Sequence, residues 1–159
     1  MSTRNPRRDL TGLSYVQAQR DGLLPRSPVA ETLGWRWVLV EKGRVVLAAT
    51  PLRSLSGYRR TLHGGAVAML MDAAMASAMN TTLDQGVMCQ TLDLKVTFLK
   101  AVPVDLSTVL VQANVVQTRR RVGAAEARLV DEADKLYASA TATFMIHAAP
   151  DPKRRDDAG

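Results

Sequence analysis

The most apolar stretch of the chain runs from residue 64 to residue 79 and reads GGAVAMLMDAAMASAM. Ala, Leu and Met dominate it, and it has no Pro and a single β-branched residue, a composition typical of an α-helix. Because the stretch is apolar on every side, we expect this helix to be buried rather than amphipathic. Asp72 is the exception, since a carboxylate in such a helix costs free energy unless it is paired, hydrogen-bonded or close to a wet cleft. We interpret Asp72 as part of a functional site; a carboxylate that ties down neighbouring backbone is the alternative.

Alternating apolar and polar residues predict six β-strands outside this helix. They are expected at residues 35–41, 45–50, 88–100, 106–118, 122–131 and 135–147. In the strand at 88–100, one face is expected to carry Leu92, Leu94, Val96 and Phe98, and the other Thr91, Asp93, Lys95 and Thr97. A short helix at residues 10–24, with Thr11 as its N-cap, and a helical turn at 30–33 are expected before the first strand.

Short polar connections, such as residues 131–134, predict hairpins and an antiparallel meander. The simplest packing is an α+β fold in which a six-stranded antiparallel sheet wraps around the one apolar helix, with a further helix at the N-terminus. Because so small a sheet cannot enclose a helix on all sides, we expect the open side to face a second copy of the chain. We expect a single domain at residues 10–148, between a flexible basic segment at 1–9 and a flexible charged segment at 149–159.

The net charge of +6 is unevenly placed along the chain. Two clusters supply much of the basic excess: Arg4, Arg7 and Arg8 near the N-terminus, and Arg119, Arg120 and Arg121 between two predicted strands. A basic excess favours anionic partners, although a solvated basic surface is the simpler interpretation. The chain has no recognised nucleic-acid motif and no aromatic stacking platform, so we do not expect it to bind nucleic acid.

Cys89 is the only cysteine, so no disulfide can form within the chain, which suits a reducing compartment. No N-terminal apolar segment resembles a signal peptide. The longest apolar stretch is short for a membrane span and contains Asp72. These observations predict a cytoplasmic protein without a membrane partner.

The sequence His63-Gly64-Gly65 stands where the apolar helix begins. Backbone N–H groups at a helix start have no partner inside the helix, and the helix dipole adds partial positive charge, so this end can receive a developing oxyanion. Asp72 can then serve as a general base on water or as a nucleophile on an acyl carbon. Gly64 and Asp72 are eight residues apart, roughly 12 Å along the helix. They can reach one carbonyl only if two copies of the helix lie antiparallel, which predicts a site shared between subunits.

Each of these residues also has a purely structural interpretation. His63 can cap the helix, and Gly64 and Gly65 can serve only a tight turn. The residues that share the helix face of Asp72 are Gly65, Ala68, Met69, Met75, Ala76 and Met79. Such a small, soft face suits either helix contact or an acyl pocket, and a Met-rich face is more often core. Thr91 can be an ordinary strand threonine.

Three segments resemble the hotdog-fold acyl-CoA thioesterases, in the PaaI-like, phenylacetate-degradation branch. They are residues 61–72 (TLHGGAVAMLMD), 91–101 (TLDLKVTFLKA) and the hairpin at 120–131 and 136–146. The resemblance extends over roughly residues 10–147. It implies a hotdog fold, homodimers that pair into homotetramers, and hydrolysis of an aromatic or short-to-medium acyl-CoA without metal or cofactor.

The same resemblance implies roles for individual residues. His63 is counted among the catalytic residues. Asp72 becomes the base or nucleophile, the Gly64 amide polarises the thioester carbonyl while Gly65 allows access, and Thr91 helps to orient the attacking water. Strand parity places Thr91 on the wrong face for this, so it reaches the site only if the strand bends at its beginning or if that face meets the partner. The substrate-binding residues are expected to be Gly65, Met69, Met75 and, near the nucleotide of coenzyme A, Arg119, Arg120 and Arg121.

One position departs from the family pattern. Related enzymes often carry Asn or Gln six residues before the histidine, where this chain has Gly57 between Ser56 and Tyr58. A non-catalytic acyl-CoA-binding protein of the same fold is therefore the alternative function. A hotdog dehydratase is a further option, but it would more naturally use His63 as its base, and the placement of Asp72 argues against it.

Overall fold

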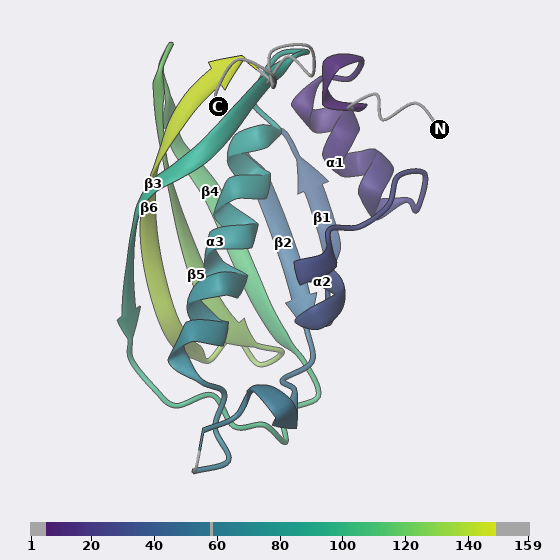
Figure 1. The fold of residues 1–159 in the computed structure, drawn as a ribbon. Helices are drawn as coiled ribbons and strands as arrows, with labels where there is room; N and C mark the ends of the chain where they lie inside the picture. Colours follow the sequence, from purple (N-terminus) through teal and green to yellow (C-terminus); the bar gives the residue numbers. More distant parts are fainter. Residues whose placement is uncertain (1–5, 58, 149–159) are drawn as a thin grey trace, which may run out of the picture.

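The computed structural model describes residues 6–57 and 59–148 (Figure 1). The elements before the long helix are η1 (Pro6–Arg8), α1 (Gly12–Arg20), α2 (Pro28–Thr32), β1 (Trp35–Glu41), β2 (Arg44–Ala49) and η2 (Arg53–Leu55). The long helix α3 (Gly64–Asn80) is followed by β3 (Val87–Phe98), β4 (Val109–Thr118), β5 (Val122–Asp131) and β6 (Leu136–Ala148). Every helix and strand expected from the sequence is present, with small shifts at the ends.

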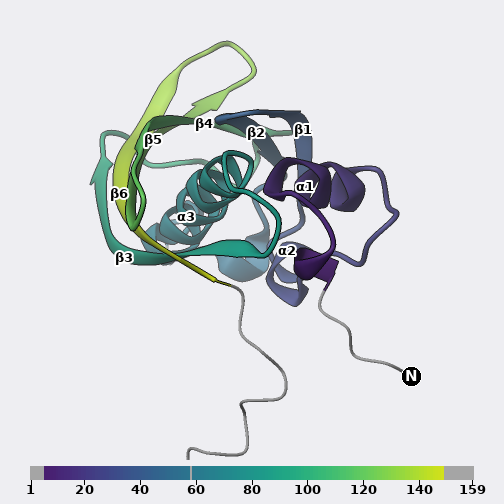
Figure 2. The same ribbon diagram turned by 90° about the horizontal axis from the view of Figure 1, so that it is seen from above.

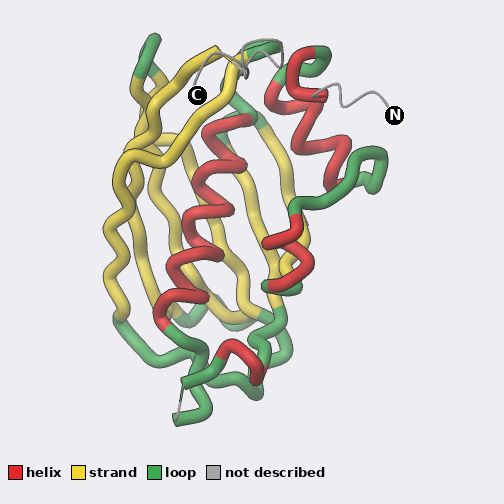
Figure 3. The backbone as a smooth tube through the Cα atoms, in the orientation of Figure 1, coloured by secondary structure: helices red, strands yellow, loops and turns green. Residues whose placement is uncertain are grey.

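The six strands form one antiparallel sheet in the order β1-β2-β4-β5-β6-β3. Seen from above, the sheet curls around α3, with α1 and α2 on the side of β1 (Figure 2). The apolar residues of α3 meet the inward residues of every strand in a single core, whose largest fully buried side chains include Phe144, Leu47, Met71 and Leu129. The expected fold, a sheet wrapped around one central helix with a further N-terminal helix, is confirmed (Figure 3).

The expected meander is correct only for β4, β5 and β6. β3 does not pair with β4, the next strand in the chain, but with β6 at the far edge of the sheet. A hairpin needs a connection of about two to five residues. The connection between β3 and β4 spans residues 99–108 and runs past the start of α3, where Leu62 N–H donates to the Val102 carbonyl at 2.8 Å. β4 is thereby free to pair with β2 and β5.

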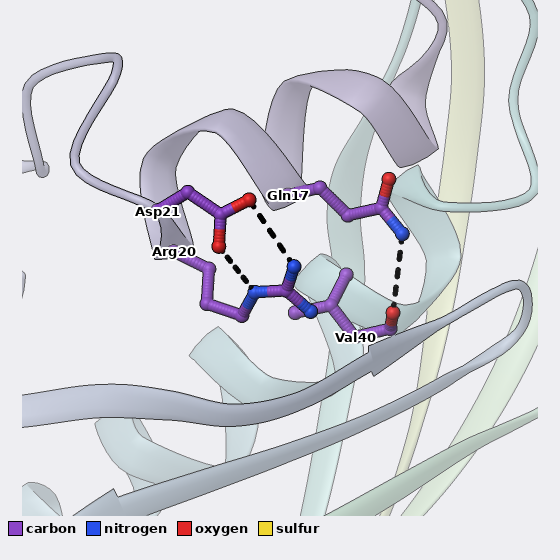
Figure 4. Close-up of polar contacts among 4 residues, drawn as sticks. All are labelled: Gln17, Arg20, Asp21 and Val40. Atoms are coloured by element: carbon purple, nitrogen blue, oxygen red, sulfur yellow. Dashed lines mark hydrogen bonds and ion pairs between the residues drawn. The ribbon is translucent and has the colours of Figure 1, made fainter.

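The N-terminal elements are attached to both α3 and β1. Thr11 caps α1, as expected, by accepting a hydrogen bond from Ser14 N–H (3.2 Å). Gly12 packs so tightly on the end of α3 that a Cβ there would lie 1.6 Å from the Asn80 carbonyl oxygen. Gln17 Nε2 donates to the Val40 carbonyl of β1 at 3.4 Å (Figure 4).

Figure 4 also shows an exposed ion pair between Arg20 and Asp21 at the end of α1.

Only part of the segments expected to be flexible lies within the described residues. Residues 1–5, with Arg4, and residues 149–159 lie outside the described residues, whereas Pro6–Arg8 form η1 and the side chain of Arg7 is buried.

Within the described residues, no helix is both long and apolar enough to span a membrane. The same part of the chain contains no group of three or more His, Cys, Asp or Glu residues that could hold a metal ion.

Candidate functional site

One side of α3 is not covered by the sheet, as expected. Along it lie Gly65, Met69, which is 47% exposed, and Asp72, which is half-buried. The opposite side points into the core, where Met75 is 0% exposed. Met75 was expected to contribute to substrate binding, and the structure corrects this: its side chain packs in the core and does not reach the open side. Met69 is the methionine that faces outward next to Asp72.

A hydrogen bond connects Thr91 of β3 to Asp72 of α3, with Thr91 Oγ1 donating to Asp72 Oδ1 at 2.8 Å. Strand parity alone would place Thr91 on the outer face. The β3–β6 register explains the difference, because Thr91 pairs with Phe144 and Asp93 with Thr143, which leaves Leu92 as an extra residue in a bulge. The expectation that Leu92 shares the inner face with Leu94 and Val96 is therefore wrong, and Leu92 is 57% exposed.

His63 caps α3. Its Nδ1 accepts a hydrogen bond from Gly65 N–H at 3.0 Å. In a neutral imidazole that accepts at Nδ1, the proton is on Nε2, so the second ring nitrogen is a donor and not a base. This argues against a dehydratase that uses His63 as its base. A side chain at Gly65 would crowd the cap, because a Cβ there would lie 3.1 Å from His63 Nδ1.

The amide of Gly64 is the second group at this helix end. Among the described residues, none accepts a hydrogen bond from Gly64 N–H. The ring of Phe98 covers the α-carbon, so that a Cβ at Gly64 would lie 3.3 Å from Phe98 Cζ. An unpaired N–H at a helix start attracts an anion or a carbonyl oxygen. The structure therefore brings His63, Gly64 and Gly65 together at one end of α3, with Asp72 two turns further along.

Two hollows follow the open side of α3. The first has a volume of about 390 Å³ and lies between α3 and the N-terminal elements. Its lining includes Arg7, Tyr15, Trp35, Trp37, Met69, Asp72, Ser77 and Asn80. We call it the Asp72 cleft. The second, also of about 390 Å³, contains His63 and Gly65 together with Ser54 and Ser56. Met69 lines both hollows and separates them.

The aromatic wall of the Asp72 cleft was not identified from the sequence. Trp35 and Trp37 contact each other edge to face, with ring centroids 4.7 Å apart, and Trp37 Nε1 donates to Ser77 Oγ at 3.4 Å. With Tyr15 they make up three of the seven aromatic residues of the chain. The available signal was the spacing of the two tryptophans, which at positions i and i+2 of a strand must share a face.

Arg7 was also missed, because it stands in a segment expected to be flexible. Its side chain is 3% exposed, and Nη2 donates to Asn80 Oδ1 (2.8 Å) and to the Val87 carbonyl oxygen (2.6 Å). The guanidinium lies over the ring of Tyr15, 4.9 Å from its centroid. Burial lowers the pKa of Arg7 below its usual value. Arg7 thus fastens η1 to the end of α3.

Cys89 lies on the inner face of β3, where its Sγ is 3.7 Å from the Ala76 carbonyl oxygen of α3. Burial, and to a smaller extent the charge of Asp72, raise the pKa of the thiol to about 12, against the opposing effect of Arg7. A thiol that stays protonated is a poor nucleophile. Cys89 is therefore not a candidate for covalent catalysis.

The arginine cluster at residues 119–121 does not meet Asp72 within one chain. All three residues are exposed in the β4–β5 turn. Arg120 and Arg121 line a separate hollow with residues of β6 and with Val87. The turn lies at the C-terminal end of α3, since Thr118 at the end of β4 contacts Thr82 at 3.2 Å.

Comparison with known proteins agrees with the fold described above. Residues 60–138 match the model of a family described as the thioesterase superfamily. A thioesterase family protein from Silicibacter pomeroyi is 26% identical, with a TM-score of 0.75 over 84% of this chain and 99% of that chain. A phenylacetic acid degradation-related protein from Ralstonia eutropha JMP134 is 26% identical, with a TM-score of 0.76 over 82% and 98%. The E. coli PaaI protein shares the fold at 20% identity, with a TM-score of 0.72 over 87% and 96%. No curated protein matches the chain in sequence.

Proposed function

Because the chain is a hotdog-fold protein of the thioesterase superfamily, we propose that it hydrolyses an acyl-CoA thioester to the free acid and coenzyme A. The substrate is an aromatic or a short-to-medium acyl-CoA, and the reaction uses no metal or cofactor. The observation that carries the proposal is the carboxylate of Asp72, held by Thr91 at the edge of a cleft with apolar and aromatic walls. The phenylacetic acid degradation-related relative supports an aromatic acyl group.

Asp72 is the proposed catalytic carboxylate. Thr91 donates to Oδ1, and among the described residues none donates to Oδ2, which leaves that oxygen to act. As a general base, Asp72 takes a proton from water while the water oxygen attacks the carbonyl carbon; the C–S bond then breaks and the coenzyme A thiolate leaves. As a nucleophile, Asp72 attacks the carbonyl carbon and expels the coenzyme A thiolate, which leaves a mixed anhydride; water then cleaves the anhydride to the free acid and the Asp72 carboxylate. Both routes need a donor at the developing oxyanion.

That donor is proposed to come from a second copy of the chain. Gly64 and Asp72 of one chain are separated by eight residues, about 12 Å along α3, too far to act on one carbonyl. Two α3 helices packed antiparallel through their open sides would bring the Gly64 N–H of one copy to the Asp72 of the other. β3 supports such pairing, because it is an edge strand. A homodimer, and a homotetramer built from two dimers, are the proposed assemblies.

The substrate is proposed to span both subunits. His63 Nε2–H and the open space at Gly65 lie beside the helix end that receives the carbonyl, and Met69 borders the acyl group. The exposed arginines at residues 119–121 are proposed to attract the phosphates of the nucleotide.

Thiol release from a panel of aryl- and alkyl-CoA esters tests the proposal. Asp72→Asn is expected to lower kcat roughly 10²- to 10⁴-fold, the usual contribution of a general base. Asp93→Asn, an exposed carboxylate on the same strand as Thr91, is the matched control and is expected to leave turnover unchanged. Wild-type turnover no greater than that of Asp72→Asn across the whole panel would refute the hydrolase.

Gly57 favours a second candidate function. A Cβ at this position would meet no atom within 4 Å, so there is room for a larger side chain, and the position supplies no polar group from its own side chain. The chain would then bind acyl-CoA without cleaving it. Saturable acyl-CoA binding without thiol release would identify this function.

A further inference from the structure

Arg7 of the N-terminal segment lines the Asp72 cleft. Asp72 and Asn80 both line it, eight residues apart on α3, which is about 12 Å along the helix axis. At the Asn80 end, Arg7 Nη2 donates to Asn80 Oδ1 and to the Val87 carbonyl oxygen. The guanidinium is almost fully buried, so it forms a wall of the cleft rather than a mobile surface group. We call this contact the Arg7–Asn80 clasp.

Neighbouring side chains and one backbone hydrogen bond hold the clasp in place. The ring of Tyr15 lies beneath the Arg7 guanidinium at 4.9 Å. Gly12 N–H donates to the Leu83 carbonyl at 2.9 Å, which fixes α1 against the end of α3. Trp37, bonded to Ser77, forms the side wall between the carboxylate and the clasp. The clasp is therefore held about two helical turns from Asp72.

We propose that the Arg7–Asn80 clasp limits the length of the acyl group that this protein accepts, an inference that rests on the proposed function. An acyl group whose carbonyl lies at Asp72 and whose chain runs toward Asn80 meets the clasp within about 12 Å. Compact acyl groups, including those with a ring, end before it. A longer linear chain presses its apolar end against a buried guanidinium and displaces hydrogen bonds to a charged group, which is costly.

The clasp joins a residue outside the matched family region to Asn80, which lies inside it. Arg7, Tyr15 and Trp37 all precede residue 60, where the match to the superfamily begins. The catalytic candidates Asp72 and Thr91 lie inside it.

The test measures binding of S-alkyl-CoA thioethers of increasing chain length, which cannot be hydrolysed. Tryptophan fluorescence reports binding, because both tryptophans of the chain line the cleft. Wild type is compared with Arg7→Ala, with Asn80→Ala, which opens the clasp while leaving Arg7 in place, and with Arg36→Ala, an exposed arginine of β1, as the control. Circular dichroism confirms that each variant is folded.

For wild type and Arg36→Ala, affinity is expected to rise with chain length and then to fall roughly tenfold or more beyond a limit. Arg7→Ala or Asn80→Ala should abolish the fall while changing the affinity for short thioethers little. An uninterrupted rise in wild type, an unchanged limit in folded clasp variants, or no binding of any thioether would overturn the inference. A failure of the proposed function gives a different result: the thioethers bind with the expected limit, but the corresponding thioesters are not cleaved.

Discussion

Thr91 and Asp72 are 19 residues apart in the sequence and belong to different elements, yet Thr91 Oγ1 donates to Asp72 Oδ1 at 2.8 Å. The bulge at Leu92 makes the contact, because an unbroken alternation would turn Thr91 to the outer face of the sheet. A hydrogen bond to the carboxylate fixes its rotamer and presents the other oxygen to the cleft. The bulge is thus the local feature that connects the sheet to the proposed chemistry.

Thr91→Ala is expected to lower kcat/KM for thioester hydrolysis roughly 10- to 100-fold, since a hydrogen bond to a charged group contributes about 1.5–3 kcal/mol. Thr91→Ser keeps the hydroxyl and should retain most of the activity. Steady-state thiol release measures both, with Thr97→Ala on the exposed side of β3 as the control. Equal activities for the Ala and Ser variants would show that the hydroxyl has no part in the reaction.

His63 serves both as the cap of α3 and, in our proposal, as a donor near the carbonyl, and two substitutions separate these roles. His63→Ala removes the acceptor for Gly65 N–H and should destabilise the protein by about 1 kcal/mol. His63→Asn can still cap and should restore the melting temperature but not the activity, because it lacks the Nε2–H group. Recovery of full activity with Asn would reduce the role of His63 to capping.

The thiol of Cys89 should react slowly with Ellman's reagent at pH 8 in the folded protein and rapidly in urea. The reason is its pKa of about 12, raised by burial from an ordinary value near 9. The folded state favours the protonated thiol, so this contribution to stability is complete below pH 9 and is lost as the pH rises from 9 toward 12. Fast, complete modification of the native protein at pH 8 would contradict this placement.

Gly12→Ala tests whether α1 is held against α3. The added Cβ would fall 1.6 Å from the Asn80 carbonyl oxygen, so the helices must separate, at a cost of about 1–3 kcal/mol. Thermal unfolding measures the loss, and Arg20→Ala, on the exposed end of α1, should leave the melting temperature nearly unchanged. An unchanged melting temperature for Gly12→Ala would show that the two helices are not packed this closely.

The elements that could be predicted best are those with a strong local alternation or a distinctive local composition. β5 was expected at residues 122–131 and lies at Val122–Asp131, and α3 was expected from its apolar composition. The bulge at Leu92 could not be predicted from the pattern of apolar and polar residues. A bulge leaves that pattern unchanged and alters only which face of the sheet the side chains before it point to. Thr91 was therefore assigned to the wrong face even though its link to Asp72 had been considered.

The other differences come from the angle between side chains on one helix and from contacts between distant segments. Met75 lies three residues from Asp72 and was assigned to the same face. On a helix, two side chains three residues apart point in directions that differ by about 60°. That difference is enough to bury Met75 while Asp72 reaches the open side. Arg7 and the tryptophans reach the cleft only through the docking of α1 and the curl of β1. No local pattern in residues 1–9 distinguishes a buried arginine from a solvated one.

The most direct test of the account is complementation between two inactive variants in a mixed dimer. One is Asp72→Asn. The other is Gly64→Pro, which removes the proposed donor N–H at a helix position that tolerates proline, after a residue with extended φ and ψ. If each site combines Asp72 of one chain with Gly64 of the other, co-expression should restore about a quarter of wild-type activity, because half of the dimers are mixed and each has one intact site. A mixture that stays as inactive as the two parents, although mixed dimers form, would contradict the shared site.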